Sequence, residues 1–222
     1  MLRMFLAILL TGSTTSTALA GDDDMMSNAP QWSGLFLGVQ AGRGVGSSYQ
    51  DLVSPKSNDI LIDVDGAFVG GSAEYLWQNG DFVFGPQAEI AWSSIDGNFS
   101  LSVSNHFSSD VDWFGSVGGK TGWAFDNVLV FGTAGFAFAD ISAGQSNSIL
   151  SKSYAESQLN TGYSLGAGLD VMLQDGWVLG AEYRYYDYAP AEYFTGSSNG
   201  FQHRVQDTEF QTISIRLRKK LN

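Results

Sequence analysis

The chain has 222 residues with 27 glycines, 14% aromatic residues, 15% charged residues, no cysteine and a formal net charge of −12. This charge argues against nucleic acid as a partner, and the lack of cysteine excludes both a disulfide framework and a lipid anchor on a cysteine. The composition matches neither a helical membrane protein nor a highly charged soluble protein, and it fits strands in which polar and apolar residues alternate.

The first residues are typical of a secretory signal. Arg3 precedes a short apolar run, and Ala18-Leu19-Ala20 supplies the small residues of a cleavage site. The run is far shorter than the ~20 apolar residues that a membrane-spanning helix needs. The sequence therefore predicts a signal peptide over residues 1–20, a flexible periplasmic lead-in over 21–31 and a single domain over 32–222.

Eight segments of that domain have the pattern of β-strands, each near or above the ~9–11 residues that a tilted strand needs to cross a bilayer. They are residues 34–43, 66–77, 82–93, 110–123, 128–140, 160–173, 177–188 and 208–218. Three connections, such as Asp175-Gly176, have tight-turn residues. The other four are long and polar, over 44–65, 94–109, 141–159 and 189–207.

The alternation of short turns with long loops predicts the fold class. We expect an all-β, eight-stranded antiparallel up-and-down transmembrane β-barrel with short periplasmic turns and four long extracellular loops. The hairpin from Gly162 to Tyr188 has the clearest pattern, because its apolar face has aromatic residues at both ends and an aliphatic middle. That face comprises Tyr163, Leu165, Ala167, Leu169, Val171, Leu173, Trp177, Leu179, Ala181, Tyr183 and Tyr185.

The same alternation predicts a facing for most other strands. The expected outward residues are Leu35, Leu37, Val39, Ala41, Val69, Ala73, Tyr75, Trp77, Phe82, Phe84, Ala88, Ile90, Trp92, Val111, Trp113, Val117, Trp123, Ile213, Ile215 and Leu217. Asp112 is expected on the inward side. The fifth strand is apolar on both faces, so its orientation stays open. Pro86 has no N–H group, and we expect a bulge or a missing ladder bond there.

Eight charged residues are expected on the inward faces, four of each sign. They are Glu74, Glu89, Asp170 and Glu182, and Lys120, Arg184, Arg216 and Arg218. The interior of an eight-stranded barrel is just wide enough for side chains to fill. We therefore expect these groups to form a structural polar network in the lumen, because an unpaired buried charge is costly. Four inward aromatic residues, Phe36, Phe68, Phe114 and Tyr186, would help to plug the lumen.

Two motifs of the chain resemble those of a known family. Trp32-Ser33-Gly34-Leu35-Phe36-Leu37-Gly38 is similar to its opening strand, and Gly166-Ala167-Gly168 with Trp177 and Glu182-Tyr183-Arg184-Tyr185-Tyr186-Asp187 is similar to its characteristic hairpin. The chain thus resembles the small outer-membrane immunogenic proteins of alphaproteobacteria, which are related in fold to the OmpA transmembrane barrel and often described as porin-like. The resemblance implies a surface-exposed, antigenic barrel that contributes to envelope integrity, with haem binding in some members.

The sequence favours a structural and surface-exposed function over three alternatives. A small-solute porin or a haem-binding surface receptor is the second hypothesis, and a lipid A-modifying hydrolase is the last. His106 and Ser108, with Asp110 and Asp112 nearby, have the residue types of a hydrolase, but His106 falls in an expected loop rather than on a strand. His106 and His203 alone are a weak basis for a haem or metal site. We therefore expect no enzymatic activity, no catalytic or metal-binding residues and no cofactor.

The location and partners follow from the expected fold. A signal peptide and a transmembrane barrel predict the outer membrane of a Gram-negative bacterium. The expected partners are outer-membrane lipid and lipopolysaccharide, the outer-membrane assembly machinery, and host or environmental ligands bound through the loops. Nucleic acid is not expected among them.

Overall fold

The structure is a computed structural model of the chain. It describes residues 32–52, 60–102, 105–147, 152–193 and 204–221. The predicted signal peptide and lead-in lie outside the described residues. The described part has no helix that is both long and apolar enough to cross a membrane.

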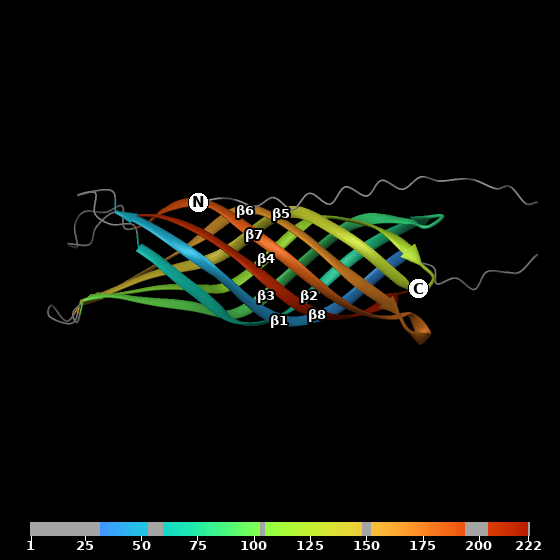
Figure 1. The fold of residues 1–222 in the computed structure, drawn as a ribbon, viewed down its shortest axis with the longest axis horizontal. Coiled ribbons are helices and arrows are strands. Elements are labelled where there is room, and N and C mark those ends of the chain that lie inside the picture. The colour runs from blue at the N-terminus through green and yellow to red at the C-terminus, as the bar shows by residue number, and fades with distance from the viewer. Residues whose placement is uncertain (1–31, 53–59, 103–104, 148–151, 194–203, 222) are drawn as a thin grey trace, which may run out of the picture.

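Eight antiparallel strands form one closed barrel in which each strand pairs with its neighbours in the chain and β8 closes on β1 (Figure 1). The strands are β1 (Gly34–Leu52), β2 (Ile60–Asn79), β3 (Phe82–Ser102), β4 (Asn105–Phe125), β5 (Val128–Asn147), β6 (Lys152–Met172), β7 (Trp177–Tyr193) and β8 (Arg204–Leu221). A short 3₁₀ turn, η1 (Gln174–Gly176), joins β6 to β7. The predicted fold class is confirmed.

The stagger of the strands fixes the tilt of the barrel. The chain of paired residues runs from Gly38 to Ser72, Glu89, Ser116, Ala137, Gly162, Tyr188 and Thr208. It returns to β1 at Ser48, ten residues beyond Gly38. A shear of this size tilts eight strands by about 40° from the barrel axis. Following paired residues once around the barrel therefore leads to a position ten residues closer to the end with the long hairpins.

Short turns gather at one end of the barrel, which we call the turn end, and the long hairpins extend toward the other, the outer end (Figure 1). The turns contain residues that accept a positive φ: Gly80 at +60°, Asp126 at 52°, Asp175 at 59° and Gly176 at 73°. Glycine and aspartate tolerate this left-handed conformation better than most residues. The three predicted tight turns are thus confirmed.

The strands are much longer than the sequence predicted. Most of the segments expected as loops over 44–65, 94–109, 141–159 and 189–207 are strand, and His106 lies on β4 rather than in a loop. The cause is an inversion of polarity toward the outer end. There Ile62 and Val64 are 1% exposed and point inward, whereas Asp63 and Asp65 point outward. The predicted strands end where this inversion begins, because apolar residues on the outward face define them.

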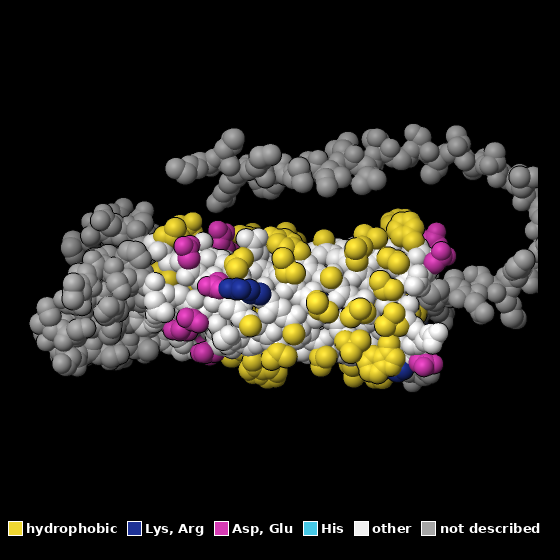
Figure 2. Space-filling model, turned by 60° about the horizontal axis from the view of Figure 1, so that its bottom comes forward, with side chains coloured by type: hydrophobic (Ala, Val, Ile, Leu, Met, Phe, Trp, Pro, Cys, Tyr) yellow, Lys and Arg dark blue, Asp and Glu magenta, His cyan; other side chains and the backbone are white. Residues whose placement is uncertain are grey.

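An apolar belt surrounds the turn half of the barrel (Figure 2). It contains exposed aromatic residues near the turns, such as Trp77, Phe84, Trp123 and Trp177. On β8 its outward apolar residues are Leu221, Leu217, Ile215 and Ile213. Lys219 interrupts them near the turns, with its amine over the Trp177 ring, and Gln211, ten residues from Leu221, is the first outward polar residue beyond Ile213. Ten residues at ~3.3 Å each, tilted by about 40°, rise about 25 Å along the axis. This equals the height of the lipid-facing band of outer-membrane barrels, about 25 Å.

The predicted facings hold except at one place. Val111 is buried inside the barrel at 1% exposure and Asp112 is exposed on the outside, the reverse of the expectation. The register of β4 against β5 shifts between Val111 and Trp113. This irregularity puts Asp112 and Trp113 on the same side, so that alternation continues with the opposite phase beyond it.

Two open points of the sequence analysis are settled. On β5, Leu129 and Phe131 are buried inside, whereas Val130 and Phe136 are exposed outside. At Pro86 the register between β2 and β3 continues unchanged on both sides, but the pairing is interrupted from Glu74↔Gln87 to Trp77↔Phe84. The expected missing ladder bond is therefore found, without a bulge.

Candidate functional site

The barrel interior is the candidate site, because it holds all eight charged residues predicted to face inward. β2, β3, β4, β6, β7 and β8 contribute them. Their exposed fractions run from 0% for Asp170 to 7% for Glu89. Alternation along each strand brings them inside, since every second residue points into the lumen.

The eight groups form two neutral quartets, a lower one nearer the turn end and an upper one nearer the outer end. In the lower quartet, Lys120 Nζ lies 2.6 Å from Asp170 Oδ2 and 3.1 Å from Glu74 Oε2. Arg218 pairs with the same two carboxylates, Glu74 and Asp170. Each base thus contacts both acids, and the lower quartet has no net charge.

The upper quartet repeats this arrangement closer to the outer end. Arg184 Nη1 lies 2.7 Å from Glu89 Oε1, and its Nη2 lies 2.6 Å from Glu182 Oε1. Arg216 Nη2 lies 2.7 Å from Glu89 Oε2, and Arg216 also pairs with Glu182. A buried ion pair is tolerated only when its geometry is good and the remaining polar atoms are satisfied. Both conditions are met by this closed ring of contacts.

Neutral side chains complete the hydrogen bonds of the upper quartet. Arg216 Nε donates to Gln40 Oε1 at 3.0 Å, and Thr133 Oγ1 donates to Glu182 Oε1 at 2.9 Å. Arg184 Nη1 donates to Ser116 Oγ at 2.6 Å. Sequence reasoning missed Gln40 and Thr133. The inward parity of Gln40 was a signal that could have found it, whereas Thr133 is on β5, whose orientation the sequence left open.

Apolar layers close the lumen on both sides of the charges. Toward the turn end lie Trp32, Phe36, Leu76, Val83, Ala124, Leu129, Phe131 and Val178. Lys120 Nζ rests over the Phe131 ring, 4.0 Å from its centroid, so the lower quartet stacks directly on this layer. Toward the outer end, Phe114 contacts Phe68, Tyr186 and Phe210, each at a centroid distance of 5.2 Å.

One hydroxyl joins the aromatic layer to the charges. Tyr186 donates to Glu89 Oε1 at 2.6 Å. The predicted inward facing of Phe36, Phe68, Phe114 and Tyr186 is confirmed by exposed fractions of 0%, 6%, 1% and 1%. Above them, Ile62, Val64, Ile95, Val111 and Ile141 continue the apolar core. Side chains therefore pack the described lumen from the turn-end layer to this apolar core.

The structure describes only part of the set of residues weighed for catalysis or metal binding. His203 lies outside the described residues, and only the backbone of His106 is described, paired with Ser100 and Ser146. Asp110 and Asp112 lie on the outer wall. Within the described ranges, no group of three or more histidine and acidic residues is placed to hold a metal ion.

Acidic side chains surround the outer wall just beyond the apolar belt (Figure 2). They are Asp63, Asp65, Asp96, Asp112, Asp140, Asp187, Asp207 and Glu209. Arg43 pairs with Asp65 in this region, and both side chains are exposed. The belt and the acids together divide the barrel into a half that faces lipid and an extension that faces water.

Comparison with known sequences identifies the family of the chain. A family model described as outer membrane protein beta-barrel domain matches residues 5–217. The chain is 26% identical to the 31 kDa outer-membrane immunogenic protein of Brucella melitensis, over 96% of this chain and 95% of the relative. It is 34% identical to a 22 kDa outer membrane protein of Rhizobium leguminosarum, over 74% of this chain and 68% of the relative.

Solved structures share the fold at low sequence identity. The outer membrane protein OprG of Pseudomonas aeruginosa has a TM-score of 0.51 at 11% identity, with 85% of this chain and 97% of that chain covered. The outer membrane protease OmpT of Escherichia coli has a TM-score of 0.52 at 8% identity, with the same coverage of 85% and 97%. At these identities the likeness establishes the barrel architecture alone.

Proposed function

Because the chain belongs to the outer membrane protein β-barrel domain family, we propose that its structural and surface-exposed role in the outer membrane is that of a closed barrel that does not conduct solutes. The packed interior is the observation that carries this proposal. Two neutral quartets fill the middle of the lumen, and aromatic and aliphatic layers cover them at both ends. An ion that crossed would have to displace paired charges and then pass an apolar layer, and both steps are costly.

The extension beyond the belt supports a surface role. Its strands carry acids outside, and inside they hold aliphatic residues such as Ile62 and Val64 beside hydrogen-bonded polar residues such as Gln206, which suits a sheet whose outer face meets water. β1 continues to Leu52 and β2 starts at Ile60, so both extend well past the belt. The extension thus carries the described strands of the hairpins beyond the lipid-facing belt. We infer that ligands of the outside medium meet the protein there, while lipid, lipopolysaccharide and the assembly machinery contact the belt.

We also propose that the protein has no enzymatic activity. The names of the sequence relatives describe outer-membrane proteins and no reaction. In the described part of the chain, the four carboxylates buried in the lumen are all engaged by arginine or lysine, so none of them is a free general base. Incubation of the refolded protein with lipid A should leave the lipid unchanged, and release of acyl chains that stops in a His106→Ala variant would refute this proposal.

Ion conductance in planar bilayers tests whether the barrel is closed. The refolded protein, with its fold checked by a boiling-dependent shift in gel mobility, should insert without producing discrete conductance steps. A matched preparation of an established porin serves as the positive control for insertion. Reproducible steps that disappear after boiling would overturn the closed barrel and favour the small-solute porin.

A further inference from the structure

A groove crosses the outer wall where β7, β8 and β1 lie side by side. It has a volume of about 230 Å³ and is lined by Val45, Gly46, Ser47, Tyr183, Tyr185, Glu209, Phe210 and Gln211. This volume equals that of about seven or eight water molecules at liquid density, which is room for one sugar ring rather than for a peptide or an oligosaccharide. The groove exists only because the barrel closes, since β1 and β8 are at opposite ends of the chain.

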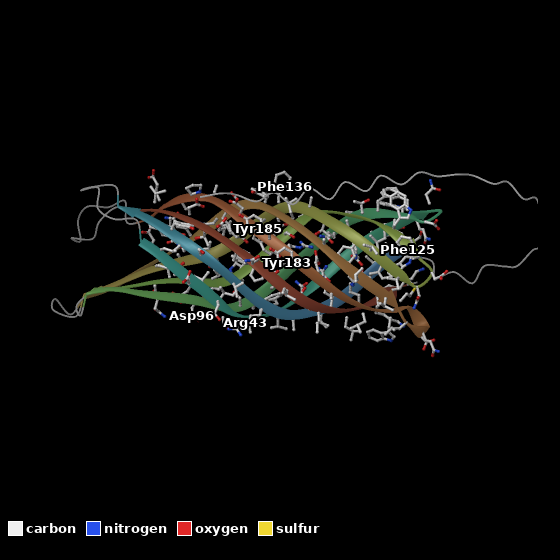
Figure 3. The ribbon with its side chains drawn as sticks, viewed as in Figure 1. Arg43, Asp96, Phe125, Phe136, Tyr183 and Tyr185 are labelled. Carbon is white, nitrogen blue, oxygen red and sulfur yellow. The ribbon has the colours of Figure 1, made fainter. Side chains whose placement is uncertain are left out.

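The groove lies at the boundary between lipid and water. Tyr183 and Tyr185 are near the upper edge of the apolar belt, between Phe125 at the turn end and Asp96 in the acidic extension (Figure 3). Gln211 is the first outward polar residue of β8 above the belt, and Glu209 follows it one step further out. Groups at this level meet the headgroups of the outer leaflet, because the belt below them already spans the hydrocarbon layer.

The lining has the chemistry of a saccharide site. Two tyrosine rings offer apolar faces for the C–H groups of a pyranose and hydroxyls for its O–H groups. Tyr183 donates to Gln211 Oε1, and Tyr185 donates to Glu209 Oε2 at 2.5 Å. These bonds fix both rings and orient an amide and a carboxylate into the groove. An ionised carboxylate accepts at about four positions, so Glu209 can also accept from sugar hydroxyls or an amino group.

Adjacent charges determine which part of a glycolipid fits. Asp187 accepts from Tyr163 at 2.8 Å and lies close to Tyr185, whose hydroxyl is 3.4 Å from Asp187 Oδ2. These acids repel a phosphate at the groove itself and favour hydroxyl, amide or ammonium donors. Arg43 is on the same face of β1 as Val45, about 6–7 Å from it along the strand. Arg43 pairs with Asp65 on one side, and a phosphate on the sugar would meet the remaining N–H groups of the same guanidinium.

We propose that this groove binds the amino-sugar headgroup of the outer-leaflet glycolipid, with one sugar ring between Tyr183, Tyr185 and Glu209 and a phosphate directed toward Arg43. The inference rests on the proposed orientation, with the long hairpins outside the cell. The proposal gives the glycolipid one specific binding site at the edge of the belt, instead of equivalent contacts all around the barrel. The acyl chains of the same molecule would then lie against the apolar belt below the groove.

Native mass spectrometry of the refolded protein in nanodiscs tests this site with three probes. They are a phosphorylated, acylated glucosamine disaccharide, the same disaccharide without acyl chains, and phosphatidylglycerol. We expect both disaccharides to bind and phosphatidylglycerol to bind at least tenfold more weakly. Glu209→Ala and the double variant Tyr183→Ala/Tyr185→Ala should each weaken disaccharide binding at least tenfold.

Two further variants keep the test independent of folding defects. Ser47→Leu fills the groove without removing a hydrogen bond of the tyrosines, and it should also abolish binding. Phe136→Ala, at a lipid-facing side chain that is 82% exposed on β5, is the matched control and should bind like the wild type. Each variant must show the boiling-dependent gel shift of a folded barrel.

Equal binding of phosphatidylglycerol, or unchanged disaccharide binding in the Glu209 and Ser47 variants, would overturn the site. Binding of the acylated probe alone, insensitive to these variants, would likewise refute it, because lipid would then be held by the belt only. Either result would come from a folded, membrane-inserted barrel. It would not affect the proposal of a closed barrel, which only conductance steps in planar bilayers would refute.

Discussion

Arg216 on β8 and Glu89 on β3 meet inside the barrel, with 2.7 Å between Nη2 and Oε2 and a sequence separation of 127 residues. β1 and β2 separate their strands in the barrel wall. The contact therefore crosses the lumen and does not belong to any ladder. Cross-lumen contacts of this kind link opposite walls, and backbone hydrogen bonds cannot do so.

Replacement of Arg216 by methionine should destabilise the barrel strongly. The change leaves the upper quartet with Glu89, Glu182 and only Arg184, so one negative charge stays buried without compensation. Breaking a buried pair in this way typically costs about 3–5 kcal/mol. Urea-dependent unfolding in lipid vesicles, followed by gel mobility, measures the loss.

Two controls identify the buried charge as the cause. The double variant Arg216→Met/Glu89→Gln removes one charge of each sign and should recover part of the lost stability. Arg43→Met removes an exposed partner of Asp65, and exposed pairs contribute at most about 1 kcal/mol. If Arg216→Met unfolded at the same urea concentration as Arg43→Met, the quartet would not hold the walls together.

The acidic extension should respond to pH through Asp110. Partial burial, with Asp96 and Asp112 nearby, raises the pKa of this carboxyl above its ordinary value, and the Ser108 hydroxyl only partly opposes the shift. A raised carboxyl pKa in the folded state means that folding favours the protonated form. The stabilising contribution is therefore present at low pH and is lost as pH rises through the folded-state pKa.

Asp110→Asn should consequently stabilise the barrel at pH 7 and make no difference near pH 3, where the wild-type carboxyl is already neutral. Asp65→Asn is the matched comparison, because Asp65 pairs with Arg43 and its removal should bring no gain. Unfolding by urea at the two pH values measures both effects. A stabilisation by Asp110→Asn that persisted at pH 3 would point to packing and not to charge.

The sequence predicted the belt and the inward charges because both follow from period-two alternation alone. Glu182 and Arg184, for example, fall on the inward face of β7 whatever the neighbouring strands do. The division into two quartets could not be predicted in this way. It depends on the shear, which decides that Lys120 of β4 lies level with Asp170 of β6 and Glu74 of β2.

The missed extension has a different cause. Beyond the belt, apolar and polar residues still alternate, but the apolar ones face the lumen and the polar ones face outward. Ile62 and Val64 point inward, and Asp63 points outward. Apolar residues on the outward face mark only the lipid-facing part of each strand, so the predicted strands end at the headgroup level. The irregularity between Val111 and Trp113 hid the change on β4, because one extra residue there reverses the phase.

The aromatic layer of the lumen should be sensitive to the loss of a single ring. Phe114→Ala removes a buried side chain that contacts Phe68, Tyr186 and Phe210, and such truncations cost about 3–5 kcal/mol. Phe136→Ala removes a ring of the same type that is 82% exposed on the lipid side, so its effect on the free energy of unfolding should be much smaller. Equal effects of the two changes would contradict the packed lumen.

Fluorescence quenching should separate the tryptophans by their position relative to the wall. The chain has six tryptophans, and Trp32 is the one buried inside the turn end of the barrel, at 1% exposure. Its backbone N–H donates to Gln78 Oε1 at 2.8 Å, and the Gln78 N–H donates to Ser33 Oγ at 3.0 Å, so the segment before β1 is held under the lumen. Trp77, Trp92, Trp123 and Trp177 are 42–61% exposed on the outer wall.

In vesicles with brominated acyl chains, most of the tryptophan fluorescence of the wild type should therefore be quenched, and a smaller part should remain unquenched. Trp32→Phe should remove the unquenched part and leave the quenched part unchanged, because bromine atoms in the lipid cannot reach the lumen. Trp123→Phe, which removes a lipid-facing indole at 53% exposure, is the matched control and should reduce the quenched part only. Complete quenching of the wild type would place Trp32 in contact with lipid, and the seal at the turn end would then be absent in the membrane.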